Sequence, residues 1–237
     1  MSKIKLFFIP HAGGSAMGYM VLKRFLDDSL IVPIPLELAG RGQRMKESCF
    51  TDIAACVEDL YQKIKSEISN GDYAIFGHSL GALLTYELVH YIKKMGDRLP
   101  VCIFFSGRIA PGADFPAKKI STIESDEEFL TQFNNLQALP KELLANDQIR
   151  KLMLPIMRAD VRMAEEYQYQ KREPLTQDIY IFVGENDILL TKDGLDAWKQ
   201  ETSKHVRNVS FPGDHFYFRQ NGQMVMEKIN EVLLHYS

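Results

Sequence analysis

Short apolar runs rich in β-branched and aromatic residues recur along the chain, and helical patterns lie between several of them. The runs occupy residues 5–9, 31–36, 73–76, 101–105, 179–183 and 206–211. Residues 51–68 and 80–94 instead place apolar side chains at helical spacing on one stripe. Gly96, just beyond the second pattern, suits a helix C-terminal cap. Because strands and helices alternate, we expect the α/β class, with a mostly parallel sheet and helices on both faces.

Residues 113–174 interrupt this alternation, because they contain no clear strand. The segment is rich in charged residues, glutamine, methionine and leucine, and its pattern predicts two or three helices. We therefore expect a helical insertion above the sheet, which would act as a lid. Either its apolar residues only bury its underside, or they also line a channel for an apolar ligand, for which flexible methionine is well suited. These residues include Phe129, Phe133, Leu136, Leu139, Leu143, Leu144, Leu152, Met153, Met157 and Met163.

Composition narrows the class of protein. The 237 residues, 46% hydrophobic and 25% charged, fit a single α/β domain over residues 1–237. A net charge of −3 argues against a nucleic-acid partner, which usually requires a basic excess. The three cysteines match no metal or redox spacing and predict reduced thiols. No apolar run has the length of a membrane span or a signal-peptide core, so we expect a cytoplasmic protein with no membrane partner.

The pattern Gly-x-Ser-x-Gly occurs once, as residues 77–81. The pattern alone is weak evidence, but a β-rich run precedes it and an amphipathic helix follows it at once. That context is typical of the nucleophile elbow of α/β-hydrolases, so we predict Ser79 as a nucleophile. The alternative is a serine that only caps a helix. His78 adjoins the serine, but in a tight elbow its side chain points away, so we expect it to pack or hydrogen bond beneath the turn.

The acid and base of such a site follow later strands, in the chain order Ser, Asp or Glu, His. Asp187 comes shortly after the run at 179–183 and is the predicted acid, with Glu185 as the alternative. His215 comes shortly after the run at 206–211 and is the predicted base. The base would take the proton of a serine hydroxyl that is otherwise a poor nucleophile.

An oxyanion hole must hold the charge that develops on an attacked carbonyl oxygen. One donor should be the backbone N–H of Leu80, directly after the nucleophile. The second should come from the loop at residues 10–15, where two adjacent glycines permit a tight turn. Ala12 is the predicted donor and His11 the alternative, unless the segment is only an ordinary glycine turn.

The chain resembles the type II thioesterases, the stand-alone enzymes that accompany non-ribosomal peptide and polyketide synthetases. It is also similar to the related medium-chain thioesterases of fatty-acid synthesis. The departures are Ala39, where the family often has proline, and Leu80, where it often has methionine. Arg41 and Arg44 are either candidate substrate contacts or partners in structural salt bridges. The similar segments are residues 6–15, 40–44, 76–82, 105–108, 110–111, 154–155, 158–160, 184–187, 197–198 and 213–216.

The resemblance implies hydrolysis of acyl thioesters carried on the phosphopantetheine arm of acyl- or peptidyl-carrier protein domains. It implies no metal and no organic cofactor, and removal of wrong or stalled acyl groups as the usual task. A thiolate is a good leaving group, since thiols ionise near pH 8.5. A modest lid favours short or medium acyl chains, and a monomer is expected. The alternatives are a carboxylesterase or lipase of the same fold, a medium-chain fatty acyl thioesterase, and a binding protein without activity.

Overall fold

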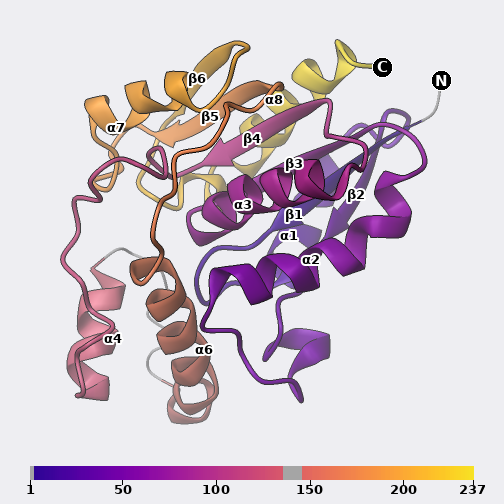
Figure 1. Cartoon of the computed structure of the whole chain (residues 1–237). Helices are drawn as coiled ribbons and strands as arrows, with labels where there is room; N and C mark the ends of the chain where they lie inside the picture. Colours follow the sequence, from indigo (N-terminus) through magenta and orange to yellow (C-terminus); the bar gives the residue numbers. More distant parts are fainter. Residues whose placement is uncertain (1–2, 136–145) are drawn as a thin grey trace.

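The computed structural model describes residues 3–135 and 146–237, and its centre is a parallel β-sheet (Figure 1). The strands lie in the order β2-β1-β3-β4-β5-β6, and every neighbouring pair is parallel. Each of the six apolar runs forms one strand, which confirms the expected fold class. The strands are β1 (Ile4–Ile9), β2 (Ile31–Pro35), β3 (Tyr73–His78), β4 (Cys102–Ser106), β5 (Asp178–Gly184) and β6 (Val206–Phe211).

Caps that the sequence provides mark the start of α2 and the end of α3. The Asp52 side chain accepts a hydrogen bond from the Ala55 N–H at the start of α2, and Gly96, with φ of +74°, ends α3 as expected. The α-helices described are α1 (Ala16–Met20), α2 (Ile53–Ile68), α3 (Leu80–Met95), α4 (Asp126–Asn134), α6 (Asp147–Glu165), α7 (Lys192–Asp196) and α8 (Gly222–Leu234). Short 3₁₀ turns are η1 (Leu22–Phe25), η2 (Gly42–Arg44), η3 (Ala197–Gln200) and η4 (Tyr217–Arg219).

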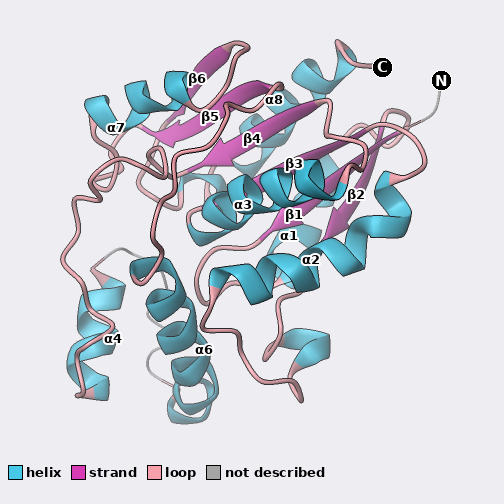
Figure 2. Ribbon diagram, in the orientation of Figure 1, coloured by secondary structure: helices cyan, strands magenta, loops and turns pink. Residues whose placement is uncertain are grey.

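Helices cover both faces of the sheet (Figure 2). Successive strand residues point to opposite faces, so Ile75 packs in the layer with Leu60 of α2 and Leu84 of α3. Its neighbour Phe76 packs in the other layer with Ile229 of α8. The inner strands β1, β3, β4 and β5 are therefore buried on both sides, which explains why they read as continuous apolar runs in the sequence, whereas the edge strands β2 and β6 are partly exposed.

Parallel pairing brings the carboxyl ends of the strands to one edge of the sheet. The pairing continues beyond the strands, because the Ser79 N–H donates to the Ser106 carbonyl at 2.8 Å and the Gly107 N–H donates to the Phe182 carbonyl at 2.9 Å. The loops that follow β3, β4 and β5 are thus held side by side. This edge is where open α/β sheets usually bind ligands.

Helices α4 and α6 belong to the segment expected as a helical insertion, and both are helical as predicted (Figure 1). Among its apolar residues, Phe129, Phe133, Met157 and Met163 are buried, whereas Leu152 is exposed. Burial of an underside is therefore part of their role. Leu136, Leu139, Leu143 and Leu144 lie outside the described residues.

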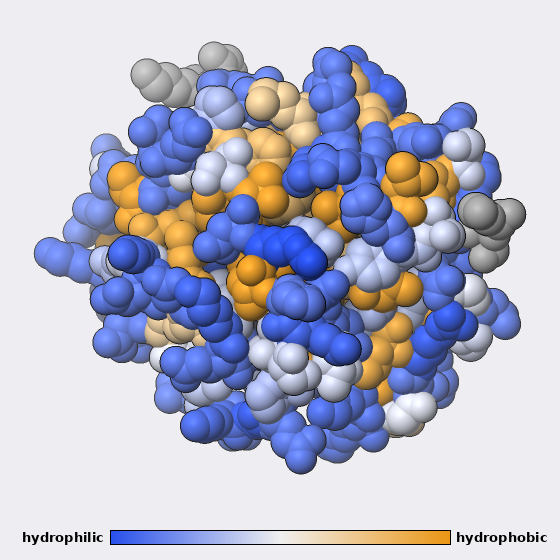
Figure 3. Space-filling view, turned by 90° about the horizontal axis from the view of Figure 1, so that it is seen from above, coloured by the Kyte–Doolittle hydropathy of each residue, from blue (hydrophilic) through white to orange (hydrophobic). Residues whose placement is uncertain are grey.

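The surface is mixed in polarity. Seen from above, hydrophilic side chains separate several smaller apolar patches (Figure 3). In the part of the chain that the structure describes, none of the helices combines the length and the apolar character required to cross a membrane.

Candidate active site

Ser79 stands at a strained turn between β3 and α3. Its φ is +54° and its ψ is −112°, and no other described residue except glycine has a positive φ. A Cβ atom at Gly77 would lie 2.2 Å from the Gly81 carbonyl oxygen, and one at Gly81 would lie 2.1 Å from the Ile9 carbonyl oxygen. Only glycine fits at either position, so the Gly-x-Ser-x-Gly spacing is a packing requirement of this turn.

Asp187 and His215 meet at the same edge of the sheet. The His215 Nδ1–H donates to Asp187 Oδ2 at 2.7 Å, and Asp187 Oδ1 accepts from the Leu189 N–H at 3.0 Å. Both side chains are buried, whereas Glu185 is exposed. A buried carboxylate held in this way can fix the tautomer of the imidazole, and the exposed alternative cannot.

Gly107, at the end of β4, allows the imidazole of His215 to approach the elbow. Its φ is +60°, and a Cβ atom there would lie 2.5 Å from His78 Cε1 and 3.1 Å from His215 Cε1. The rings of His78 and His215 are 4.9 Å apart between centroids, so His215 lies close to the residue that precedes Ser79. Gly107 lies inside one of the family-like segments, but no role for it could be predicted from the sequence.

His78 lies beneath the turn, as expected. Its Nδ1 is 2.8 Å from Ser106 Oγ, which is in turn 2.6 Å from the Tyr217 hydroxyl. Complete burial, and next the charge of His215, hold the pKa of His78 well below its usual value. The ring is therefore held against β4 as a neutral imidazole, which fits the packing role expected for it.

The loop after β1 is a tight turn in which hydrogen bonds fix the directions of backbone N–H groups. Gly13 has φ of +71° and its N–H donates to Asp160 Oδ2 at 2.7 Å, while the Gly14 N–H donates to the His11 carbonyl at 2.8 Å. The His11 Nδ1–H donates to the Ala12 carbonyl, and burial lowers the pKa of His11 to about 3. The glycine N–H groups are therefore engaged within the protein, whereas Ala12 remains the predicted donor.

The two arginines of the loop after β2 form structural salt bridges. Arg41 makes two bonds to Asp160 of α6, at 2.6 and 2.8 Å, and Arg44 makes two bonds to Asp59 of α2, at 2.8 and 2.9 Å. Arg44 also pairs with Glu47. The structural salt bridges expected as one of the two hypotheses are thus present, and Arg41 also lines the smaller of the two cavities described next. No role for Asp160 could be predicted from the sequence, because its buried ion pair with Arg41 depends on the fold.

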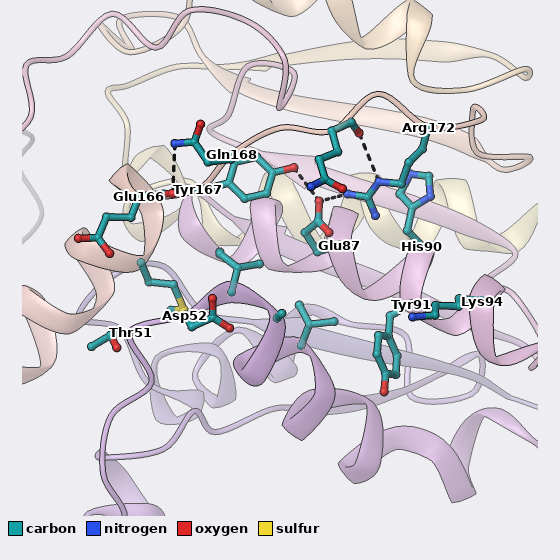
Figure 4. A pocket seen from close by; sticks show the side chains of 15 residues that line it. Thr51, Asp52, Glu87, His90, Tyr91, Lys94, Glu166, Tyr167, Gln168 and Arg172 are labelled. Carbon is teal, nitrogen blue, oxygen red and sulfur yellow. Dashed lines mark hydrogen bonds and ion pairs between the residues drawn. The ribbon is translucent and has the colours of Figure 1, made fainter.

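Two cavities in the described part of the chain differ in how near they lie to the candidate site. One, of about 430 Å³, extends from the His11–Ser15 loop to Met153 and Ile156 of α6. A larger one, of about 700 Å³, lies along the outer face of α3 and is lined by Glu87 and Arg172 (Figure 4). Glu87 is eight residues beyond Ser79, or about 12 Å along the helix. The smaller cavity therefore adjoins the loop of the candidate site, and the larger one is remote from it.

Comparison with known proteins gives a consistent result. The family described as Thioesterase domain matches residues 4–233. The gramicidin S biosynthesis protein GrsT of Aneurinibacillus migulanus is 33% identical over 226 residues, which cover 95% of this chain and 87% of that protein. The structure of ClbQ from the colibactin NRPS/PKS pathway matches with a TM-score of 0.93 at 35% identity and covers 100% of both chains. The type II thioesterase BorB from the borrelidin biosynthetic cluster matches with a TM-score of 0.88 at 27% identity over 98% of this chain and 93% of that one. The chain therefore belongs to the thioesterase family, as a type II thioesterase of the α/β-hydrolase superfamily.

Proposed function

We propose that this enzyme uses Ser79, His215 and Asp187 to hydrolyse acyl thioesters on the phosphopantetheine arm of carrier protein domains. The observation that carries the proposal is the buried 2.7 Å hydrogen bond from His215 to Asp187, beside a serine held at a strained elbow. The names of the similar proteins, which belong to non-ribosomal peptide and polyketide pathways, support carrier-bound substrates.

The reaction proceeds in two halves. His215 Nε2 takes the proton of the Ser79 hydroxyl as its oxygen attacks the thioester carbonyl carbon. The C–S bond then breaks, the carrier thiolate takes the proton from Nε2, and the acyl group remains on the serine. In the second half His215 deprotonates a water molecule that attacks the acyl ester, and Ser79 regains its proton as the acid leaves. Asp187 accepts the Nδ1–H bond throughout and stabilises the transient imidazolium.

The tetrahedral intermediates of both halves carry a negative oxygen. We assign its two donors to the backbone N–H groups of Leu80, at the first residue of α3, and Ala12, in the loop after β1. The N-terminus of α3 adds a favourable dipole at this position.

Residues 113–174 form a lid in this proposal, and the smaller cavity receives the acyl chain. Leu152, Met153 and Ile156 of α6 line one side of that cavity. Apolar and flexible side chains of this kind suit an alkyl chain without hydrogen-bonding groups.

The test compares an acyl-carrier protein thioester with an oxygen ester of the same acyl group. We expect the thioester to be hydrolysed with the higher kcat/KM, and Ser79→Ala to abolish both turnover and covalent labelling by a fluorophosphonate. A strong preference for the oxygen ester would instead favour the carboxylesterase or lipase alternative. Unchanged turnover by Ser79→Ala would contradict the assigned nucleophile.

A further inference from the structure

The ion pair between Arg41 and Asp160 joins two distant parts of the chain within the protein interior. Arg41 follows β2, Asp160 lies on α6, and their side chains are only 5% and 1% exposed. The two bonds, at 2.6 and 2.8 Å, use both carboxylate oxygens. Burying such a pair costs desolvation energy, so its presence is weak evidence for a stabilising role alone.

Both partners also bind the loop that follows β1. Asp160 Oδ2 accepts the Gly13 N–H at 2.7 Å, and Arg41 Nη1 donates to the Gly14 carbonyl at 3.2 Å. The ion pair thus holds one N–H and one carbonyl of adjacent residues, which fixes the orientation of the peptide planes there. Ala12, the assigned oxyanion donor, is the residue directly before Gly13.

The loop also packs directly against α6. A Cβ atom at Gly13 would lie 3.1 Å from Met157 Cγ, one helical turn from Asp160. The conformation of the oxyanion loop therefore depends on where α6 lies.

The opposite charges of Asp160 and Arg41 also suit a role in holding the loop after β1. A lone carboxylate beside an oxyanion hole would oppose the developing negative charge, since like charges repel strongly where water is excluded. The paired guanidinium of Arg41 cancels that charge, while Asp160 Oδ2 still accepts the Gly13 N–H beside its bond to Arg41. The loop is held firmly without a net negative charge beside the reacting carbonyl.

We propose that Asp160 is a positioning residue for the oxyanion hole, so that the enzyme is active only when α6 is packed against the loop after β1. This inference rests on the proposed function, and in particular on Ala12 as a donor. It predicts a defect in transition-state stabilisation with little change in ground-state binding, because the loop acts on the charge that develops during reaction.

The main test is Asp160→Asn, which keeps the size of the side chain but removes the charge. We expect kcat to fall about 10- to 100-fold with KM within about twofold, given that one oxyanion donor typically contributes 100- to 1,000-fold. The inhibition constant of an alkyl boronic acid, a tetrahedral mimic, should rise by the same factor as kcat falls. Thermal melts would establish the folded fraction, to which rates are normalised.

Asp59→Asn is the matched control. It breaks the similar two-bond pair with Arg44, on the same loop, without touching residues 10–15. We expect it to lower the melting temperature and leave kcat and boronate inhibition unchanged within about twofold, as for a surface-proximal pair.

Arg41→Lys is the second variant, in case Asp160→Asn does not fold. It keeps the positive charge but cannot make the two-pronged contact and the bond to Gly14 together. We expect a smaller fall in kcat, again at constant KM.

Two outcomes would overturn the inference. In the first, folded Asp160→Asn or Arg41→Lys retains wild-type kcat; in the second, either variant changes KM alone. A wild-type protein that does not hydrolyse carrier thioesters would instead contradict the proposed function. In that case, boronate binding and the rate at which a fluorophosphonate labels Ser79 would still show whether Asp160 positions the loop. Failure of the proposed function can therefore be told apart from failure of this inference.

Discussion

Three histidines, His11, His78 and His90, carry lowered pKa values, and they contribute to how stability depends on pH. Burial is the largest cause in each case; it lowers the pKa of His11 to about 3 and that of His90 to about 4. In the unfolded chain such groups take up a proton near pH 6.5, whereas in the folded protein they stay neutral. The unfolded state therefore binds more protons below pH 6.5, and stability falls as the pH is lowered.

His90 allows this prediction to be tested away from the candidate active site, because it lies on α3 beside the remote cavity with an unpartnered Nε2. Replacement of His90 by phenylalanine should reduce the loss of unfolding free energy between pH 7 and pH 5 by about 1–2 kcal/mol. Urea titrations at both pH values would measure it, with exposed His205→Phe as the control. An equal pH dependence in wild type and His90→Phe would show that this histidine does not remain neutral when buried.

Single residues of the site differ in how far the sequence could identify them. Ser79 was predictable because its glycines, strand and helix are all local, and Asp187 and His215 were predictable because each follows a strand. Gly107 and Asp160 were not, since their roles depend on contacts with residues more than 100 positions away or on a neighbouring strand. Hydrophobic periodicity carries no information on such partners.

At the scale of elements, the loop after β4 shows how backbone conformation positions His215, the proposed base. A methyl group at Gly107 would meet both the strain of a positive φ and the rings of His78 and His215. We expect Gly107→Ala to lose about 2 kcal/mol or more of stability and at least tenfold in kcat, because strain of this kind typically costs 1–3 kcal/mol.

The matched control is Gly96→Ala, at the end of α3. Its φ of +74° imposes similar strain, but a Cβ atom there would meet nothing within 4 Å. Gly96→Ala should therefore lose stability by about 1 kcal/mol with unchanged kcat. Equal kinetic effects in the two variants would mean that strain alone, and not displacement of the imidazole, explains the Gly107 result.

The elements themselves were largely predictable, and the reason is physical. The four inner strands, β1, β3, β4 and β5, are buried on two faces, so their apolar runs stand out, and α2 and α3 carry clear stripes and caps. The bounds of α4 and α6 were not predicted. These helices pack partly on loops and on each other, so the pattern of their apolar positions does not follow one face of a sheet.

At the scale of the whole molecule, the proposed catalytic residues follow strands of the sheet, and α6 closes one side of the candidate site. The 430 Å³ cavity lies between them, with the glycine loop on one wall and Met153 and Ile156 on the other. If this cavity receives the acyl chain, its free volume sets the chain length that the enzyme accepts. Each methylene group that does not fit changes the discrimination between two substrates by about 1–3 kcal/mol.

Met153→Trp tests this idea, because Met153 is only partly buried and a larger ring there would fill cavity space without entering the core. We expect kcat/KM for an octanoyl thioester to fall about tenfold or more, while that for the acetyl thioester changes less than about threefold. Tyr91→Trp, in the remote cavity, is the control and should alter neither substrate. An equal loss for both chain lengths would assign the cavity to the pantetheine arm, which every substrate shares. Unchanged selectivity and rate would show that neither the acyl chain nor the pantetheine arm occupies this cavity, which would contradict the proposed acyl site.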